Sequence, residues 1–478
     1  MRRTLMLLMG LLMCTPVVGA RDLNRQNYLV GEKASGMGGA FSAMVGDAAS
    51  LYYNPAGLAG MKRRGLSLSA SVYQVHWEHY DKLLDVDVGL RTDMDSQTFS
   101  TFPSSVVYTL PLTEMKDPEA FHHVLAVGVI VPDYDKFEHV IDQSIGLYPF
   151  ELKGSFTGED MTYWVGAAYA ASLFGRLRLG LSVFMLAHLS DLSGNLGMKM
   201  AVIDESTLET IYAYSNVSMD RSAISLTMLS QMGLQFDITP NLCVGLTLRS
   251  PTFGRFNSYV NMLQLASSHM EDADGNPVVT EELSGYSDRI ETDDVTMEKK
   301  LPLMIGLGLA YRVPDSWALG LDLRFHLPQD EYLLFSGPSV YPVTPMGEVI
   351  LDPDRALDAD ERRQHTWLLN ASLGAEVKLS ESWSIRAGAF TNFSVVDMDY
   401  YDRPDRRLDA LLLPRMMSFG ASLGLGRRQE NSSNSIIITY VYGSGESYSI
   451  NEIFGLPAAH IEVQAHTLTL SLAGTADF

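Results

Sequence analysis

The chain has 478 residues, of which 46% are hydrophobic and 19% charged, and its formal net charge is −22. The hydrophobic content excludes a disordered chain, and the excess of 57 Asp and Glu over 35 Lys and Arg leaves no basic stripe for nucleic-acid phosphates. The same acidic balance disfavours electrostatic docking on an anionic membrane surface.

Residues 1–20 have the pattern of a secretory signal peptide. Arg2 and Arg3 precede a short apolar run over 5–13, and small residues at 18–20 supply a cleavage site. The apolar run is too short for a helical transmembrane anchor. We therefore expect an exported protein. Of its two cysteines one remains after cleavage, so no intrachain disulfide can form.

Residues 21–64 show no regular hydrophobic period and read as loop and short helix. Glycine and proline are frequent, so backbone freedom matters more here than helix or strand propensity. Two short runs stand out within this segment. Their residues are Gly36, Gly38 and Gly39 in the first, and Asn54, Pro55, Ala56 and Gly57 in the second.

From residue 65 to the end, apolar residues alternate with small or charged ones. In 317–327, for example, the odd positions are apolar and the even positions are small or charged, which is the period of a strand with one greasy and one polar face. Each such segment is long enough to cross a bilayer as a tilted strand of roughly 9–11 residues. We count fourteen: 65–77, 104–112, 123–133, 161–173, 177–188, 223–238, 242–253, 302–313, 317–327, 366–379, 383–394, 415–427, 434–443 and 462–474.

The connections between these segments alternate strictly between short and long. Tight turns fall at 174–176, 239–241, 314–316 and 380–382. Short turns at one end and long loops at the other are typical of outer-membrane barrels, whereas a β-sandwich or a propeller does not require this alternation. The sequence thus predicts an all-β, transmembrane antiparallel β-barrel of about 14 strands over 65–478. The expected long loops are 78–103, 134–160, 189–222, 254–301, 328–365, 395–414 and 444–461.

The charges within the strands indicate which face meets lipid. Asp322, Arg324, Glu376 and Lys378 all fall on the face of small residues. A charge on the lipid face near the midplane costs roughly 2–4 kcal/mol, so this face is expected to enclose the lumen. Its small side chains leave room for another part of the chain. We therefore predict that residues 21–64 fold into the lumen as a hatch or plug.

Patterns that would support catalysis or metal binding are weak. The glycines at 36–39 lack the strand–loop–helix unit of a nucleotide site. His76 and His79 would face opposite sides of a strand, and 272–276 resembles a turn more than a calcium loop. We expect no metal, no cofactor and no enzymatic activity, although a hydrolase built across separate strands stays open.

The run from Gly36 to Phe41 and the run from Tyr53 to Ala59 resemble the N-terminal hatch of the FadL/TodX outer-membrane transporters. The count of fourteen strands is that family's number. The resemblance implies an outer-membrane barrel that takes up hydrophobic compounds, either long-chain fatty acids or aromatic hydrocarbons, and that is not an enzyme. It also implies a monomer whose partners are a hydrophobic small molecule and outer-membrane lipid.

The third strand carries a further similarity, because the stretch 127–132 contains Gly128 and ends at Pro132. The family often has a Gly-x-x-x-Pro stretch there, beside an opening in the barrel wall. Proline lacks a ladder N–H, so Pro132 could open a gap or bulge through which a hydrophobic molecule leaves sideways. The alternative is that Pro132 simply ends the strand at the outer rim. For Asn54, an ordinary Asx-type turn is compatible with a role in the hatch.

A different function is also compatible with this beginning of the chain. Some proteins with a similar start are attachment or shuttle components of a protein-secretion apparatus. The long segments 254–301 and 328–365 could then hold a protein partner.

Overall fold

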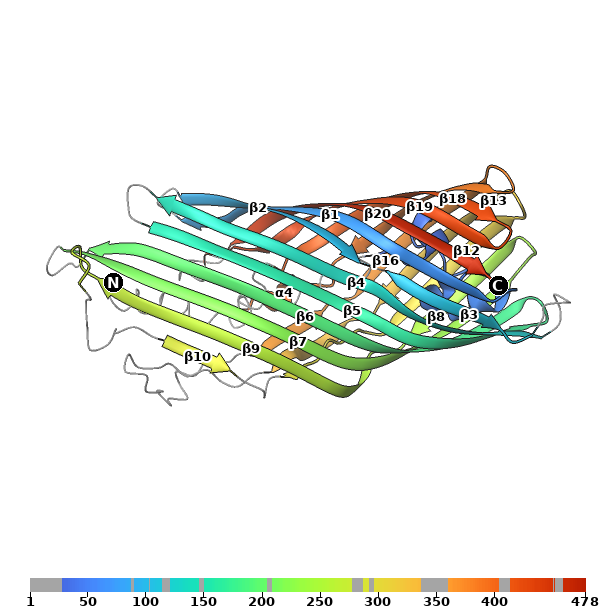
Figure 1. The fold of residues 1–478 in the computed structure, drawn as a ribbon, viewed down its shortest axis with the longest axis horizontal. Coiled ribbons are helices and arrows are strands. Elements are labelled where there is room, and N and C mark those ends of the chain that lie inside the picture. The colour runs from blue at the N-terminus through green and yellow to red at the C-terminus, as the bar shows by residue number, and fades with distance from the viewer. Residues whose placement is uncertain are drawn as a thin grey trace.

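The computed structural model shows a closed antiparallel β-barrel of fourteen strands, in which the first strand β1 pairs with the last strand β20 (Figure 1). The structure describes residues 28–478 except 87–89, 103, 114–120, 146–149, 204–208, 277–286, 292–295, 337–359, 404–412, 450 and 452–458. The expected signal peptide over 1–20 lies outside the described residues. The number of strands agrees with the number of alternating segments in the sequence.

Fourteen wall strands result when β2 and β3 are taken as one interrupted strand and β8 and β9 as another. Consecutive strands pair with their neighbours in antiparallel fashion around the barrel. The wall strands are β1 (Gly65–Val86), β2 (Leu90–Phe102), β3 (Ser105–Pro111), β4 (His122–Ile145), β5 (Phe150–Leu173), β6 (Leu177–Ile203), β7 (Thr210–Asp237), β8 (Leu242–Arg249), β9 (Phe253–Glu271), β12 (Met304–Val313), β13 (Trp317–His326), β16 (Leu368–Lys378), β17 (Trp383–Phe393), β18 (Arg415–Gln429), β19 (Ser432–Tyr448) and β20 (His460–Asp477).

The large apolar side chains of the wall point outward. Leu319, Leu321 and Leu323 on β13 are each about two-fifths exposed, while Asp322 between them is buried. Trp317 opens β13 directly after a tight turn and is also exposed, as an interfacial aromatic residue would be. The greasy face therefore forms the outside of the barrel, as the position of the charges predicted.

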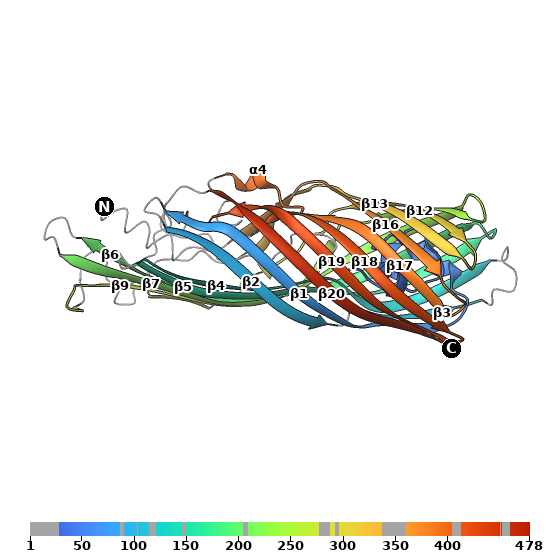
Figure 2. The ribbon, with the colours of Figure 1, turned by 90° about the horizontal axis from the view of Figure 1, so that it is seen from above.

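Several segments expected to be long loops are instead extensions of the wall strands. The strands β5, β6 and β7 are 24, 27 and 28 residues long, whereas β16 and β17 each have 11. The expected loops 134–160 and 189–222 consist mostly of these extensions. One side of the barrel is thus much taller than the other (Figures 1 and 2).

The polarity of the two faces reverses along the tall strands. On β6, Leu181 and Met185 are exposed outward, but further along the strand the outward residues are polar. There Leu192, Leu196 and Met198 are buried on the inner face instead. A strand that leaves lipid for water must exchange the two faces in this way, since the outward side chains then meet solvent. The prediction of polar loops was wrong because the alternation continues with its polarity inverted.

Further elements lie inside or beside the wall. The N-terminal segment contains α2 (Glu32–Gly36), α3 (Ser50–Tyr53) and the 3₁₀ helix η1 (Pro55–Gly60). The remaining elements are β10 (Ser287–Glu291), β11 (Thr296–Met297), β14 (Gln329–Ser336), β15 (Glu361–His365) and α4 (Met398–Tyr401). Among the described residues, no helix has the length and apolar character needed to cross a membrane.

Candidate functional site

Residues 28–64, which we call the N-terminal segment, lie against the inner face of the wall near the tight turns. The carboxylate of Asp322, on β13, is the main anchor and is 1% exposed. It accepts hydrogen bonds from the backbone N–H groups of Phe41 (3.0 Å) and Ser42 (2.9 Å) and from Ser42 Oγ (2.7 Å). Arg324 Nη2 lies 3.2 Å from the same carboxylate. Asp322 therefore satisfies three donors of the segment and neutralises a neighbouring cation.

A second carboxylate anchors the beginning of the segment. Glu32, in α2, accepts hydrogen bonds from Ser433 Oγ (2.6 Å) and Ser435 Oγ (2.7 Å) on β19. Its Oε1 also lies 3.6 Å from Arg386 Nη1, and the Arg386 Nε donates to Glu376 at 2.8 Å. Glu32, Arg386 and Glu376 form one ionic chain in which Glu32 and Arg386 are buried, so α2 is fixed to the wall at β17 and β19.

Glycines line the wall where the N-terminal segment touches it. A Cβ on Gly388 would lie 2.2 Å from the backbone N of Gly38, and one on Gly374 would lie 2.3 Å from the carbonyl oxygen of Met37. No real Cβ tolerates such a contact, so the segment packs backbone against backbone. The same holds around the wall at seven positions, which we call the glycine belt: Gly180, Gly233, Gly245, Gly308, Gly320, Gly374 and Gly388.

Members of the belt face one another across several pairs of strands. Gly180 pairs with Gly233, Gly245 pairs with Gly308, and Gly374 pairs with both Gly320 and Gly388. On the next strand Ser422 replaces glycine at the position paired with Gly388. Its hydroxyl accepts from the N–H of Gly38 at 3.0 Å. The short run of glycines in the N-terminal segment and those of the wall thus fit each other.

Within the N-terminal segment, Gly38 and Gly39 end helix α2 in the left-handed region, with φ of 63° and 78°. The N–H of Gly39 donates to the carbonyl of Ala34 at 2.8 Å, which closes the last turn of the helix. Gly36, the last residue of the helix, lies against Arg386, whose Cβ would be 2.9 Å from a Cβ at that position. These three glycines therefore set the path of the chain along the wall.

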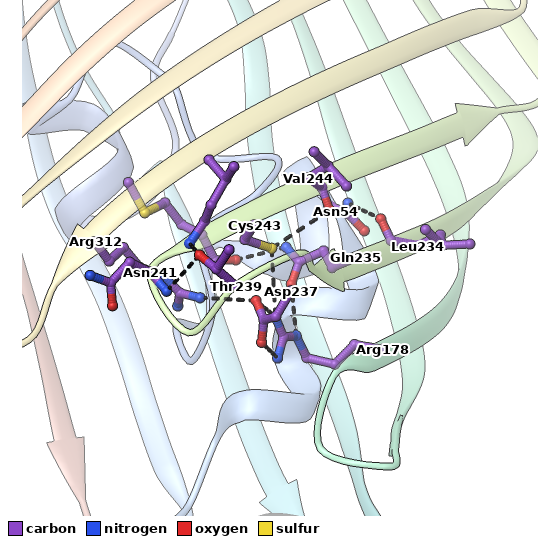
Figure 3. Close-up of polar contacts among 12 residues, drawn as sticks. Asn54, Arg178, Leu234, Gln235, Asp237, Thr239, Asn241, Cys243, Val244 and Arg312 are labelled. Carbon is purple, nitrogen blue, oxygen red and sulfur yellow. Dashed lines mark hydrogen bonds and ion pairs between the residues drawn. The ribbon is translucent and has the colours of Figure 1, made fainter.

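Asn54 is fully buried and makes contacts on two sides (Figure 3). Its Oδ1 accepts from the N–H of Ala56 at 3.1 Å, so it caps η1, whose first residue is Pro55. Its Nδ2 donates to the carbonyl of Ser42 at 2.8 Å and lies 3.3 Å from that of Leu234 on β7. Gly57 has no room for a side chain, because a Cβ there would lie 2.5 Å from Ser50 Oγ. Asn54 therefore forms the Asx-type turn and also joins the two halves of the segment to the wall.

We expect Asn54→Ala to loosen the segment by about 0.5–2 kcal/mol, because it removes the helix cap. Asn54→Asp keeps the capping oxygen but faces the carbonyls of Ser42, Leu234 and Leu246 with a carboxylate, so it should loosen the segment more than alanine does. Hydrogen exchange of the amides in 42–60 measures the effect. Equal protection in wild type and both variants would contradict this role.

Gln235 is buried on the inner face of β7 and binds the backbone of the N-terminal segment (Figure 3). Its Nε2 donates to the carbonyls of Ser42 at 2.9 Å and Met44 at 2.8 Å. Its Oε1 accepts from Arg178 Nε at 3.2 Å, and Arg178 in turn forms a bidentate pair with Asp237 at 2.8 and 2.7 Å. This pair orients the amide that receives the segment.

The wall is interrupted at Pro132. On β4, Ile130 pairs with Trp164 and Asp133 with Thr162, so Val131 and Pro132 face a single residue of β5. This is a β-bulge, and β4 continues beyond it to Ile145. The expectation that Pro132 could end the strand at the rim was therefore wrong.

The opposite edge of β4 changes its partner at the same point. The ladder between β3 and β4 ends at Ser105 and Ile130. Beyond it, in the part of the chain that the structure describes, no backbone ladder joins β2 to β4. The hydroxyls of Ser96 and Thr98 on β2 instead donate to backbone carbonyls of β4. Side chains thus replace the backbone ladder over this part of the wall.

A pocket of about 620 Å³, open solvent included, lies beside the bulge, and we call it the Pro132 pocket. Its apolar lining consists of Tyr52, Pro132, Trp164, Leu186, Leu301 and Pro302. Its polar part is largely paired. Lys299 Nζ lies 2.8 Å from Asp133 Oδ2 and 3.2 Å from Asp160 Oδ1, and His188 Nε2 is 2.7 Å from the same Asp160 oxygen.

The structure brings the N-terminal segment and the candidate residues of the third strand together through α3. A Cβ at Gly128 would lie 3.0 Å from Leu51 Cδ2, and Tyr52 shares the Pro132 pocket with Pro132. Asn54 instead lies toward β7 and β8. Among the described residues no group of three or more His, Cys, Asp or Glu could hold a metal ion.

Three solved structures share this architecture. The toluene transporter TodX of Pseudomonas putida has a TM-score of 0.58 and 14% identity, covering 96% of this chain and 100% of that chain. The toluene transporter TbuX of Ralstonia pickettii has a TM-score of 0.53 and 12% identity over 94% and 98%. A FadL homologue of Pseudomonas aeruginosa has a TM-score of 0.51 and 14% identity over 95% and 100%.

The likeness is one of structure rather than sequence. No protein-family model matches the chain, and no curated protein sequence matches it. The solved structures nevertheless align along nearly its whole length. The chain has the fold of the FadL/TodX-type barrels, which confirms the fold expected from the resemblance to that family.

Proposed function

We propose that the protein is an outer-membrane channel for the passive uptake of hydrophobic small molecules, either long-chain fatty acids or aromatic hydrocarbons. The observation that carries this proposal is the Pro132 pocket, an aromatic-lined cavity at the point where the wall ladder stops. A closed ladder confines a molecule to the lumen, whereas an interrupted one permits sideways exit into lipid. The names of TodX, TbuX and the FadL homologue support the class of substrate.

In this proposal the N-terminal segment acts as a hatch. It occupies the lumen at the end with the tight turns, which we assign to the periplasmic side. The long strands then extend from the membrane into the extracellular space. A molecule that enters from the tall end reaches Tyr52 and Pro132 before it meets the glycine belt. The hatch then directs it toward the interruption in β4. The protein works as a monomer and performs no chemistry on its cargo.

The test removes the bulge in the ladder between β4 and β5. Deleting Pro132 removes the extra residue of the bulge, so that Val131 would pair with Tyr163 between the existing pairs on either side. We expect uptake of radiolabelled toluene and oleate to fall to the level of cells without the protein. Pro132→Ala keeps the extra residue and serves as the matched control, with uptake largely retained.

Two outcomes would contradict different parts of the proposal. Full uptake by a correctly folded deletion variant would contradict the lateral route. Uptake of every hydrophobic probe at background level by the wild-type protein would contradict the function itself. A stoichiometric protein partner recovered from detergent extracts, without any hydrophobic ligand, would favour a role in secretion instead.

A further inference from the structure

A second cavity is lined by the beginning of the N-terminal segment, including Tyr28 and Leu29. It has about 1070 Å³, open solvent included, and is lined by β1, β4, β17, β18, β19 and β20 and by residues of the segment itself. Helix α2 lies beside it and is fixed to β19 by the Glu32 anchor. We call this cavity the hydroxyl chamber, after the side chains described next.

The wall of the chamber carries a cluster of hydroxyl groups. Thr439 on β19 and Thr469 on β20 face each other as a directly paired couple. Ser418 and Ser471 line the same cavity. Within the described part of the chain, none of these four hydroxyls has a hydrogen-bond partner. None of them belongs to the unpartnered polar atoms that are fully enclosed by protein, so each keeps some accessible surface. They therefore face the cavity with their hydrogen-bonding capacity unused.

Apolar side chains line the chamber as well. Phe390, Met416 and Val441 contribute from β17, β18 and β19, and Leu29 contributes from the N-terminal segment. Polar groups at a few positions within an otherwise apolar lining fix the orientation of a ligand. The chamber is thus matched to a molecule that has both an apolar body and a hydrogen-bonding group.

The charged groups that line the chamber are two carboxylates and one ammonium group, those of Glu78, Asp135 and Lys136, and the excess of carboxylates disfavours an anion. Glu78 and Asp135 line it, and Glu78 Oε1 lies 3.2 Å from His76 Nε2. Burial, and then the carboxylate of Asp135, raise the pKa of Tyr28 well above its ordinary value, so its hydroxyl stays neutral and donates to Gln74. A carboxylate head would meet like charge here, whereas an uncharged head would not.

We propose that the hydroxyl chamber binds the uncharged, oxygen-bearing head of an amphiphile, such as a fatty alcohol, through Thr439 and Thr469. The inference rests on the proposed function, and it adds an uncharged, oxygen-bearing amphiphile to the hydrophobic molecules proposed above. It also gives the lumen two distinct compartments. The Pro132 pocket takes apolar bodies, and the hydroxyl chamber selects for the head.

The test measures retention of three radiolabelled probes by the full-length protein held in amphipol, corrected for amphipol alone. The probes are 1-dodecanol, dodecane and dodecanoate, which share a chain length. We expect 1-dodecanol to be retained about tenfold more tightly than dodecane, because two net hydrogen bonds distinguish them. Dodecanoate should be retained less than 1-dodecanol.

The double variant Thr439→Val/Thr469→Val removes both hydroxyls at nearly constant shape, and it should lower retention of 1-dodecanol to that of dodecane. Thr475→Val, on β20 but near the tight turns, is the matched control and should retain the preference. Heat-modifiable migration on gels verifies that each barrel is folded.

Each outcome has a distinct meaning. Equal retention of 1-dodecanol and dodecane by the wild-type protein, or an unchanged preference in the double variant, would overturn the assignment of the chamber. Tighter retention of dodecanoate than of 1-dodecanol would overturn the inference that the chamber binds an uncharged head. Either result leaves uptake through the Pro132 pocket standing, whereas background retention of all three probes together with background cellular uptake would remove the proposed function itself.

Discussion

Replacing Gly388 by alanine should displace the N-terminal segment from the barrel wall. The new Cβ would lie 2.2 Å from the N of Gly38 and 2.3 Å from the carbonyl carbon of Met37, and both atoms belong to backbone that cannot rotate away. Overpacking of this kind costs typically about 1–3 kcal/mol, which corresponds to an increase of about 5- to 140-fold in the population with the segment displaced. Limited proteolysis within residues 28–64 should accelerate accordingly, and single-channel conductance should rise.

The neighbouring strand offers a matched control. A Cβ on Gly424, also on the inner face, would come no closer than 3.3 Å to Gly36 Cα, so Gly424→Ala requires only a small adjustment. Its proteolysis rate should stay near that of the wild type. Equal rates for the two variants would show that close backbone packing is not what holds the segment.

Among single side-chain removals, loss of the Asp322 carboxylate should weaken the attachment of the N-terminal segment to the wall the most. Asp322→Ala removes the acceptor of the Phe41 and Ser42 N–H groups. It also removes the carboxylate that pairs with Arg324. Breaking a buried pair by removing one partner typically costs about 3–5 kcal/mol. We expect loss of hydrogen-exchange protection at residues 41 and 42 while the barrel itself stays folded.

The control for this prediction is Asp315→Ala, in the exposed turn before β13. Its partner Lys378 lies 2.8 Å away, but both side chains are largely exposed, and such surface pairs contribute little. Protection at residues 41 and 42 should not change in this variant. Asp322→Asn keeps one acceptor oxygen, so its protection at residues 41 and 42 should lie between that of Asp322→Ala and that of Asp315→Ala.

Most of the wall could be predicted from the sequence because lipid imposes a strict period. The start of β6, β8, β13, β17 and β18 agrees with the alternating segments that the sequence shows. The starts of β5 and β7 were missed, since their outer parts lie in water. There Glu159 and Asp220 point outward, and the apolar residues point inward. Alternation marks a strand in either environment, but only in lipid does the greasy face have to be the outer one.

The site was less accessible to sequence reasoning. The motif at Asn54 identified the capping turn, since its contacts are local. Asp322 was recognised as a lumenal charge, but its partners Phe41 and Ser42 lie 281 and 280 residues away, and one sequence cannot pair such positions. Gln235 was missed for the same reason. The signal that existed for Asp322 was a charged residue between two leucines, Leu321 and Leu323, in the middle of a wall strand.

The unequal heights of the wall make the two sides of the barrel differ in how far they rise above the membrane. With about 3.3 Å per residue and a tilt of about 40°, the 28 residues of β7 rise roughly 70 Å along the axis, and the 11 residues of β17 roughly 28 Å. The low side therefore ends close to the bilayer surface, while the high side stands roughly 45 Å above an apolar band of about 25 Å. A molecule that approaches along the membrane from the low side therefore passes a shorter wall of strands than one that approaches from the high side.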